Sequence, residues 1–274
     1  MARPWIEFVQ SQCLPWQPVH FRDVRPGVEC KVLSADAETG ACSLLVRYPA
    51  GWSARGGSLS VDDELFVLEG ALEIGNRSHE EWAFAHFPAG FATGAWSAPR
   101  GAVVLEFFSG SPARANGAMA YDERHLVEHL DAMKVPYTGN FHPEFPPGAG
   151  RKILYQNPVT LDTTWLLGTM PLRWAERSEV HPTVEEMYLL AGEVHGNRGV
   201  MRPGAYFWRP ASKAHGPFGT QTGNLYFFRT QGGQLKTTYV DAERPFQWWP
   251  AYDPVLPSEM QAYRGEVPAG ARRW

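Results

Sequence analysis

The sequence predicts an all-β protein that contains two tandem copies of one fold. Of its 274 residues, 27 are glycine and 23 are proline. Long helical patterns are scarce, so many short strands joined by turns are expected. An internal repeat gives the number of domains. Like residues recur 122 positions apart in several pairs, among them Pro49 and Pro171, Trp52 and Trp174, and Gly70 and Gly192.

The repeat divides the chain into four segments. We expect an N-terminal domain over residues 1–113, a linker over 114–134, a C-terminal domain over 135–240 and a C-terminal arm over 241–274. The linker should contain a short helix, because its apolar residues recur at helical spacing within residues 121–133. The arm carries aromatic residues among prolines, and we expect it to pack in extended form on a domain.

Composition excludes several classes of protein. The net charge is −4 and there is no basic block, so neither nucleic acid nor an anionic membrane surface is an expected partner. Cys13, Cys30 and Cys42 are odd in number and have no metal-binding spacing, which indicates free thiols in a reducing compartment. No signal peptide or membrane span is visible. The sequence therefore predicts a cytoplasmic protein.

A candidate metal site lies in the second copy of the repeat. A strand is predicted over residues 179–190, because β-forming residues there end at a glycine turn. Its period of two would place Glu179, His181 and Glu185 on one face. A second strand is predicted over residues 205–209, and His215 follows it in a loop. Charged alternation also occurs on the wet face of a half-buried strand, so the string alone leaves both readings open.

The first copy of the repeat acts as an internal control. Its residues at the corresponding positions include no histidine and only one carboxylate; they are Gly57, Leu59, Asp63 and Thr93. The scaffold therefore does not need these ligands in order to fold. We expect the C-terminal copy to carry the working site.

The spacing resembles the two motifs of the cupin superfamily, G-x5-H-x-H-x3,4-E-x6-G and G-x5-P-x-G-x2-H-x3-N. His181 matches the second histidine of the first motif, Glu185 its glutamate, and His215 the histidine of the second motif. The chain also departs from the pattern. Glu179 stands in place of the first histidine, Ser212 replaces the second glycine of the second motif, and Gly219 stands where its asparagine would fall.

The resemblance implies two jelly-roll β-barrels in tandem, a bicupin, with one divalent metal ion per chain. His181, Glu185 and His215 would form a two-histidine, one-carboxylate set, which favours Fe(II). Glu179 would be either a fourth ligand, which would also suit Mn(II), Zn(II) or Ni(II), or a catalytic general base. The candidate pocket residues are Trp174, Arg177, Tyr188 and Trp208.

The fold alone decides little about the reaction, since cupins include dioxygenases, decarboxylases, lyases, isomerases and binding proteins. The open-sided ligand set and the many aromatic residues favour a mononuclear non-haem dioxygenase acting on a small diketone or aromatic ketone. Metal-assisted lyase or isomerase chemistry with Glu179 as base is the alternative enzyme. A non-catalytic sensing module is disfavoured, because no output segment is visible. The expected partner is a small-molecule substrate, and a homodimer is left open.

Overall fold

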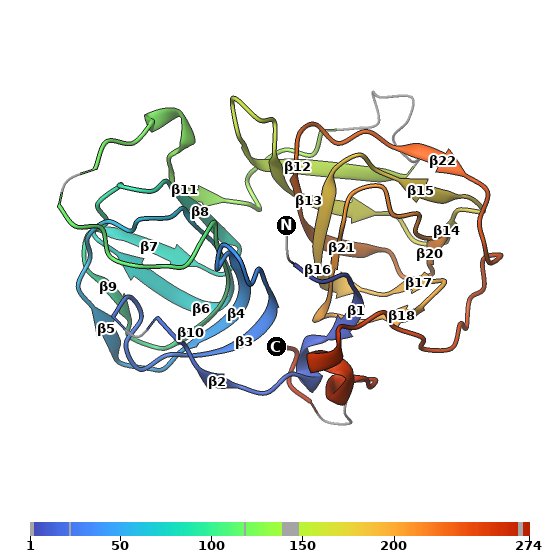
Figure 1. Ribbon diagram of the computed structural model, residues 1–274, viewed down its shortest axis with the longest axis horizontal. Coiled ribbons are helices and arrows are strands. Elements are labelled where there is room, and N and C mark those ends of the chain that lie inside the picture. Colours follow the sequence, from blue (N-terminus) through green and yellow to red (C-terminus); the bar gives the residue numbers. More distant parts are fainter. Residues whose placement is uncertain (1–2, 22, 118, 139–147, 268–270) are drawn as a thin grey trace. The chain divides into compact units, whose positions relative to one another are not determined.

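The computed structural model describes residues 3–21, 23–117, 119–138, 148–267 and 271–274. It contains two compact units, one formed by residues 1–3 and 14–134 and the other by residues 4–13 and 135–274 (Figure 1). Strands dominate both units, and the strand pairs are antiparallel, so the all-β prediction is confirmed. Within the described residues, no helix is long and apolar enough to cross a membrane.

The first unit is built on a sheet whose main path runs β11-β8-β6-β10-β4-β3-β2, with β5, β7 and β9 branching from it. A short 3₁₀ helix, η2 (Glu123–His125), precedes the last strand. The strands are β2 (Gln17–Pro18), β3 (Glu29–Ala35), β4 (Cys42–Tyr48), β5 (Trp52–Ala54), β6 (Asp63–Ile74), β7 (Arg77–Glu80), β8 (Ala83–Phe87), β9 (Trp96–Ala98), β10 (Ala102–Phe108) and β11 (Val127–Asp131).

The second unit has a six-stranded sheet in the order β1-β19-β16-β21-β13-β12, a four-stranded sheet β14-β20-β17-β18 and the pair β15-β22. Its 3₁₀ helices are η1 (Ser11–Cys13) and η3 (Ser258–Tyr263). The strands are β1 (Ile6–Gln10), β12 (Ala149–Gln156), β13 (Thr163–Thr169), β14 (Arg173–Trp174), β15 (Ser178–Val180), β16 (Val184–Gly192), β17 (Val194–Gly196), β18 (Gly199–Met201), β19 (Ala205–Arg209), β20 (Phe218–Thr220), β21 (Asn224–Gln231) and β22 (Thr238–Val240).

The two units share one order of strand pairing. The path β3-β4-β10-β6-β8 of the first unit corresponds to β12-β13-β21-β16-β19 of the second. The shared turns need glycine at matching positions: Gly70 and Gly192 both have φ +75°, and a Cβ on either would collide with the carbonyl oxygen of Gly101 or Gly223. The sequence repeat therefore has a counterpart in the order of the strands.

The strand that flanks this shared path, next to β8 or β19, comes from a different part of the chain in each unit. In the first unit it is β11, where a helix was expected; only η2 is helical, because residues 127–131 pair with the edge strand β8 instead. In the second unit it is β1, which pairs with β19. Residues 4–13, which the sequence analysis assigned to the N-terminal domain, therefore belong to the second unit.

The strand predicted over residues 179–190 is interrupted. β15 ends at Val180 and β16 begins at Val184, and the two pair with different partners. Pro182 lies in the gap, where its missing N–H cannot interrupt a ladder. The other predicted strand, over residues 205–209, is observed as β19.

The C-terminal arm packs on the second unit. Val255 and Glu7 exchange two backbone hydrogen bonds, of 2.8 and 2.6 Å. The hydroxyl of Tyr252 donates to the carbonyl oxygen of Phe8 at 2.9 Å. The arm and the N-terminal strand thus support each other.

A buried ion network fastens the N-terminal strand to the second unit. The guanidinium of Arg209 donates from Nε and Nη2 to the two carboxylate oxygens of Glu7, at 2.7 and 2.6 Å, and from Nη1 to Glu185. The side chains of Arg209 and Glu7 are only 2% and 4% exposed. A buried guanidinium must be paired and hydrogen-bonded, so β1 supplies a charge that the site strand β19 requires.

We predict that Glu7→Gln loosens the second unit alone. The change keeps the size of the side chain but removes one of the two carboxylates around Arg209, and breaking a buried pair costs roughly 3–5 kcal/mol. Hydrogen-exchange mass spectrometry should show faster exchange in β16 and β19 and no change in β4 and β10. Glu69→Gln, at an exposed position of β6, is the control. Unchanged exchange in β19 would contradict the role given to Glu7.

Candidate metal centre

Three side chains of the second unit converge on one point. One ligand atom from each of Glu179, His181 and His215 lies within 4.8 Å of the others. Backbone pairing brings them together: Glu179 N–H donates to His215 O at 2.9 Å, and His215 N–H donates to Glu179 O at 3.0 Å. Two residues paired in this way face the same side of the sheet, and His181 follows Glu179 at the period of a strand.

The loop that carries His215 is tied back to the same segment. The backbone N–H of Ser212 donates to His181 O at 2.7 Å. Ser212 adopts φ +66°, in the left-handed region that favours glycine. Gly90, which stands 122 positions earlier, has φ +89° and donates to Leu59 O in the same way. Ser212 therefore keeps the loop conformation despite its departure from the motif.

Both imidazoles are oriented by backbone carbonyl groups. His181 Nδ1 lies 3.0 Å from Lys236 O, and His215 Nδ1 lies 2.9 Å from Lys213 O. A carbonyl oxygen can only accept, so Nδ1 of each ring carries the proton and Nε2 offers a lone pair. His181 Nε2 is buried and has no hydrogen-bond partner among the described residues. Metal-binding histidines are commonly held in this way, with the ring nitrogen that does not bind the ion donating to a carbonyl oxygen.

Glu185 lies beside both imidazoles. Its Oε1 is 3.7 Å from His181 Nε2, and its Oε2 is 3.6 Å from His215 Nε2. Arg209 Nη1 donates to Oε2, so part of the carboxylate's hydrogen-bonding capacity is already used. The structure thus brings all four predicted ligands together, with Glu185 fixed by a cation and Glu179 without such a partner in the described part of the chain.

The electrostatics of the site fit a divalent cation. Burial, reinforced by repulsion from Glu185, raises the pKa of Glu179. Burial, reinforced by Arg209 and His181, lowers the pKa of His215 well below its ordinary value. His215 therefore stays neutral and able to ligate. Arg173 and Arg209 only partly offset the rise in the pKa of Glu179, and a bound cation would favour its charged form further. A donor set of two imidazoles and a carboxylate with an orphaned buried nitrogen meets the requirements of a transition-metal ion.

The four side chains open onto a cavity of about 120 Å³ in the second unit. Its walls are mainly apolar, and most of the lining residues come from the six-stranded and the four-stranded sheets of this unit. Trp165 and Phe228 stack on each other with ring centroids 5.5 Å apart. The apolar lining residues are Ala149, Trp165, Leu167, Ala175, Met187, Val194, Met201, Phe207, Phe218, Phe228 and Leu235.

None of the four predicted pocket residues lines this cavity. Tyr188 and Trp208 follow Met187 and Phe207, which do face it, and successive residues of a strand point to opposite faces. Tyr188 instead forms a hydrogen bond of 3.0 Å with the hydroxyl of Ser11. The assignment of these two residues to the pocket is therefore corrected.

Trp174 and Arg177 also lie outside the cavity, because both point toward solvent. Trp174 is 55% exposed and contacts Trp248 of the arm, with centroids 6.1 Å apart. Arg177 is exposed and donates to the carbonyl oxygen of Tyr239 at 2.6 Å.

Sequence reasoning missed Arg209 and Arg173, the two cations that do line the cavity. Arg209 could have been found, because it shares the strand face of Phe207 and pairs in register with Glu185. Arg173 could have been found less readily, since β14 is only two residues long. No local signal pointed to Glu7, the partner of Arg209 in β1.

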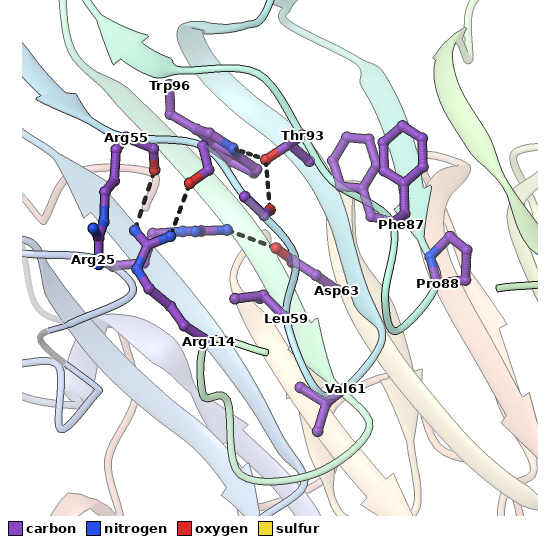
Figure 2. A pocket seen from close by; sticks show the side chains of 13 residues that line it. Arg25, Arg55, Leu59, Val61, Asp63, Phe87, Pro88, Thr93, Trp96 and Arg114 are labelled. Atoms are coloured by element: carbon purple, nitrogen blue, oxygen red, sulfur yellow. Dashed lines mark hydrogen bonds and ion pairs between the residues drawn. The ribbon is translucent and has the colours of Figure 1, made fainter. Parts of the chain in front are cut away.

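The first unit shows what the same scaffold looks like without the ligands. Gly57 and Thr93 exchange backbone hydrogen bonds of 2.9 and 3.2 Å, as Glu179 and His215 do. The guanidinium of Arg25 points at Asp63, the counterpart of Glu185, at 2.6 Å, and lies 3.9 Å from the centroid of the Trp96 ring (Figure 2). The remaining cavity measures about 20 Å³. An arginine thus supplies the cation in the first unit.

We compared the chain with curated protein sequences and with solved structures. No curated protein matches the chain in sequence. A solved structure from Nostoc punctiforme, named a "putative dioxygenase", superposes with a TM-score of 0.79 at 20% identity, covering 88% of this chain and 92% of that one. A mutant of oxalate decarboxylase from Bacillus subtilis gives a TM-score of 0.57 at 11% identity, covering 85% and 79%. At these identities the likeness concerns the fold alone.

A model of one protein family covers most of the chain. It spans residues 15–237 and describes a domain of unknown function, DUF4437. The chain therefore belongs to the DUF4437 family.

Proposed function

We propose that this protein is a metal-dependent enzyme of the non-haem dioxygenase type, built as two tandem cupin barrels with one divalent ion in the second. The observation that carries the proposal is the convergence of Glu179, His181 and His215 on the wall of an apolar cavity. The repeated order of strand pairing supports the tandem arrangement. The likeness to a protein named as a dioxygenase supports the reaction type.

The ligand set favours Fe(II), because two imidazoles and one carboxylate leave coordination positions open. When bound, the ion would supply a Lewis acid and redox chemistry. The chain's own residues would hold and shield it: the carbonyl groups of Lys213 and Lys236 orient the imidazoles, and Arg209 fixes Glu185 as an outer or fourth ligand. Mn(II), Zn(II) and Ni(II) are the alternatives that metal analysis would distinguish.

The cavity limits the size of the substrate. A dry apolar cavity of about 150 Å³ holds one benzene molecule. The cavity of about 120 Å³ therefore suits a short diketone or a ketone with one aromatic ring. Aromatic walls such as Trp165 and Phe228 would exclude water from the reacting atoms.

A second candidate is lyase or isomerase chemistry with Glu179 as general base. It is favoured by the raised pKa of Glu179, caused by burial and by Glu185, which makes this carboxylate a stronger proton acceptor. In this alternative the ion would act as a Lewis acid only.

We predict about one divalent ion per chain, bound in the second unit. His181→Ala and His215→Ala should each weaken metal binding by about 100-fold or more, since the loss of an outer-shell partner alone costs 10–100-fold. Elemental analysis after purification and titration with Fe(II) or Zn(II) measures both. His129→Ala, at an exposed histidine of the first unit, is the control and should bind normally. Two ions per chain would contradict the assignment.

We predict that the Fe(II)-loaded protein consumes oxygen when given a suitable short diketone or aromatic ketone. An oxygen electrode with a substrate panel measures the rate, and mass spectrometry identifies cleaved products. Protein loaded with redox-inactive Zn(II) should consume none. Turnover of a panel member with Zn(II), without oxygen uptake, would replace the dioxygenase by the lyase or isomerase.

We predict that Glu179→Gln lowers metal occupancy and activity together, because it removes the ligand charge but keeps one weak oxygen donor. In the metal-free protein the same change should raise the melting temperature. The raised pKa of Glu179 means that stability is lost as pH rises through that pKa, and glutamine does not titrate. Full occupancy with lost activity would instead assign Glu179 as the base.

A further inference from the structure

One cation of the cavity acts on its neighbours only through space: burial raises the pKa of Glu179 and of Tyr226, and the charge of Arg173 partly offsets that rise by favouring their ionised forms. Arg173 lies in β14, is partly buried and lines the cavity. Within the part of the chain that the structure describes, its guanidinium makes no hydrogen bond or ion pair. Arg209, by contrast, is held by Glu7 and Glu185. Arg173 therefore offers a free set of donors toward the interior of the cavity.

The charges around the cavity are unbalanced in a way that an anion would correct. Three carboxylates, those of Glu7, Glu179 and Glu185, and two guanidinium groups, those of Arg173 and Arg209, give a net charge of −1. A bound divalent ion would change this to +1. Buried charge is costly unless it is compensated, so one negative group on the ligand would make the loaded site neutral.

The rest of the lining specifies the body of the ligand. The apolar walls offer few hydrogen bonds, and a second charge or several hydroxyl groups on the ligand would be left unpaired against them. The volume of about 120 Å³ is close to that which holds one benzene molecule. The ligand should therefore combine one anionic group with one ring or one branched aliphatic group.

We propose that the second unit binds a small monocarboxylate with a single aromatic ring or a branched aliphatic body, and that Arg173 pairs with its carboxylate. A guanidinium suits this role because its planar donors match a carboxylate in bidentate fashion. The proposal rests on the metal site of the proposed function, but it is independent of the reaction that the site catalyses.

The test is isothermal titration calorimetry of the full chain loaded with Zn(II), whose occupancy is measured first. The probes are benzoate, phenylacetate and 3-methylbutanoate, each compared with its neutral amide. We expect at least one acid to bind about 10-fold more tightly than its amide, as a charge-assisted hydrogen bond predicts. Metal-free protein should lose this preference, because its cavity is already negative.

Variants assign the preference to Arg173. Arg173→Gln should weaken binding of the acid about 10-fold and leave binding of the amide within 2-fold, and Arg173→Lys should keep part of the preference. Arg177→Gln, which changes an exposed arginine of the same segment, should have no effect. Circular dichroism confirms that each variant is folded.

Three results would overturn the inference. Equal binding of acids and amides by the loaded wild-type chain, or an acid preference that survives in Arg173→Gln, would show that Arg173 is not the anchor while leaving the metal site intact. Failure to bind Zn(II) at all would overturn both the metal site and the inference that rests on it.

Discussion

The guanidinium of Arg209, held between Glu7 and Glu185, is the interaction on which the second unit depends. It joins the N-terminal strand to the strand that borders the cavity, across 202 positions of sequence. It also fixes Oε2 of Glu185, which lies 3.6 Å from His215 Nε2, while Oε1 of the same carboxylate lies 3.7 Å from His181 Nε2. Because all three charged side chains are almost fully buried, none can be removed without leaving another uncompensated. The same network therefore stabilises both the fold and the arrangement of the candidate metal ligands.

The two units share one backbone scaffold but differ in the side chains at the corresponding site positions. Both retain the same strand order and the same pair of backbone hydrogen bonds beneath the site. In the first unit the guanidinium of Arg25 forms ion pairs with Asp63 and Glu106, and the remaining cavity has a volume of only about 20 Å³. In the second unit Arg209 pairs with Glu185, the counterpart of Asp63, and the imidazoles, the carboxylates and the aromatic walls still surround a cavity of about 120 Å³.

Local patterns predicted more of the site than of its surroundings. Glu179, His181, Glu185 and His215 could be grouped from sequence, because their spacing resembles the two motifs of the cupin superfamily. The same period of two could have excluded Tyr188 and Trp208, since each follows a residue that faces the cavity. The pairing of Glu7 with Arg209 could not be predicted, because β1 pairs with β19 of the second unit, whereas residues 14–134, which follow it in sequence, belong to the first unit. The helix predicted in the linker was wrong for a related reason. The apolar residues there recur at helical spacing, but residues 127–131 form a strand that pairs with the edge strand β8.

The account as a whole rests on a single ion in the second unit, held by Glu179, His181 and His215. The most direct measurement is anomalous X-ray diffraction from crystals of the metal-loaded protein, recorded above and below the absorption edge of the ion. The account predicts one anomalous peak per chain, within bonding distance of His181 Nε2, His215 Nε2 and a carboxylate oxygen of Glu179. A peak beside Asp63 in the first unit, or no peak between the two imidazoles, would contradict it.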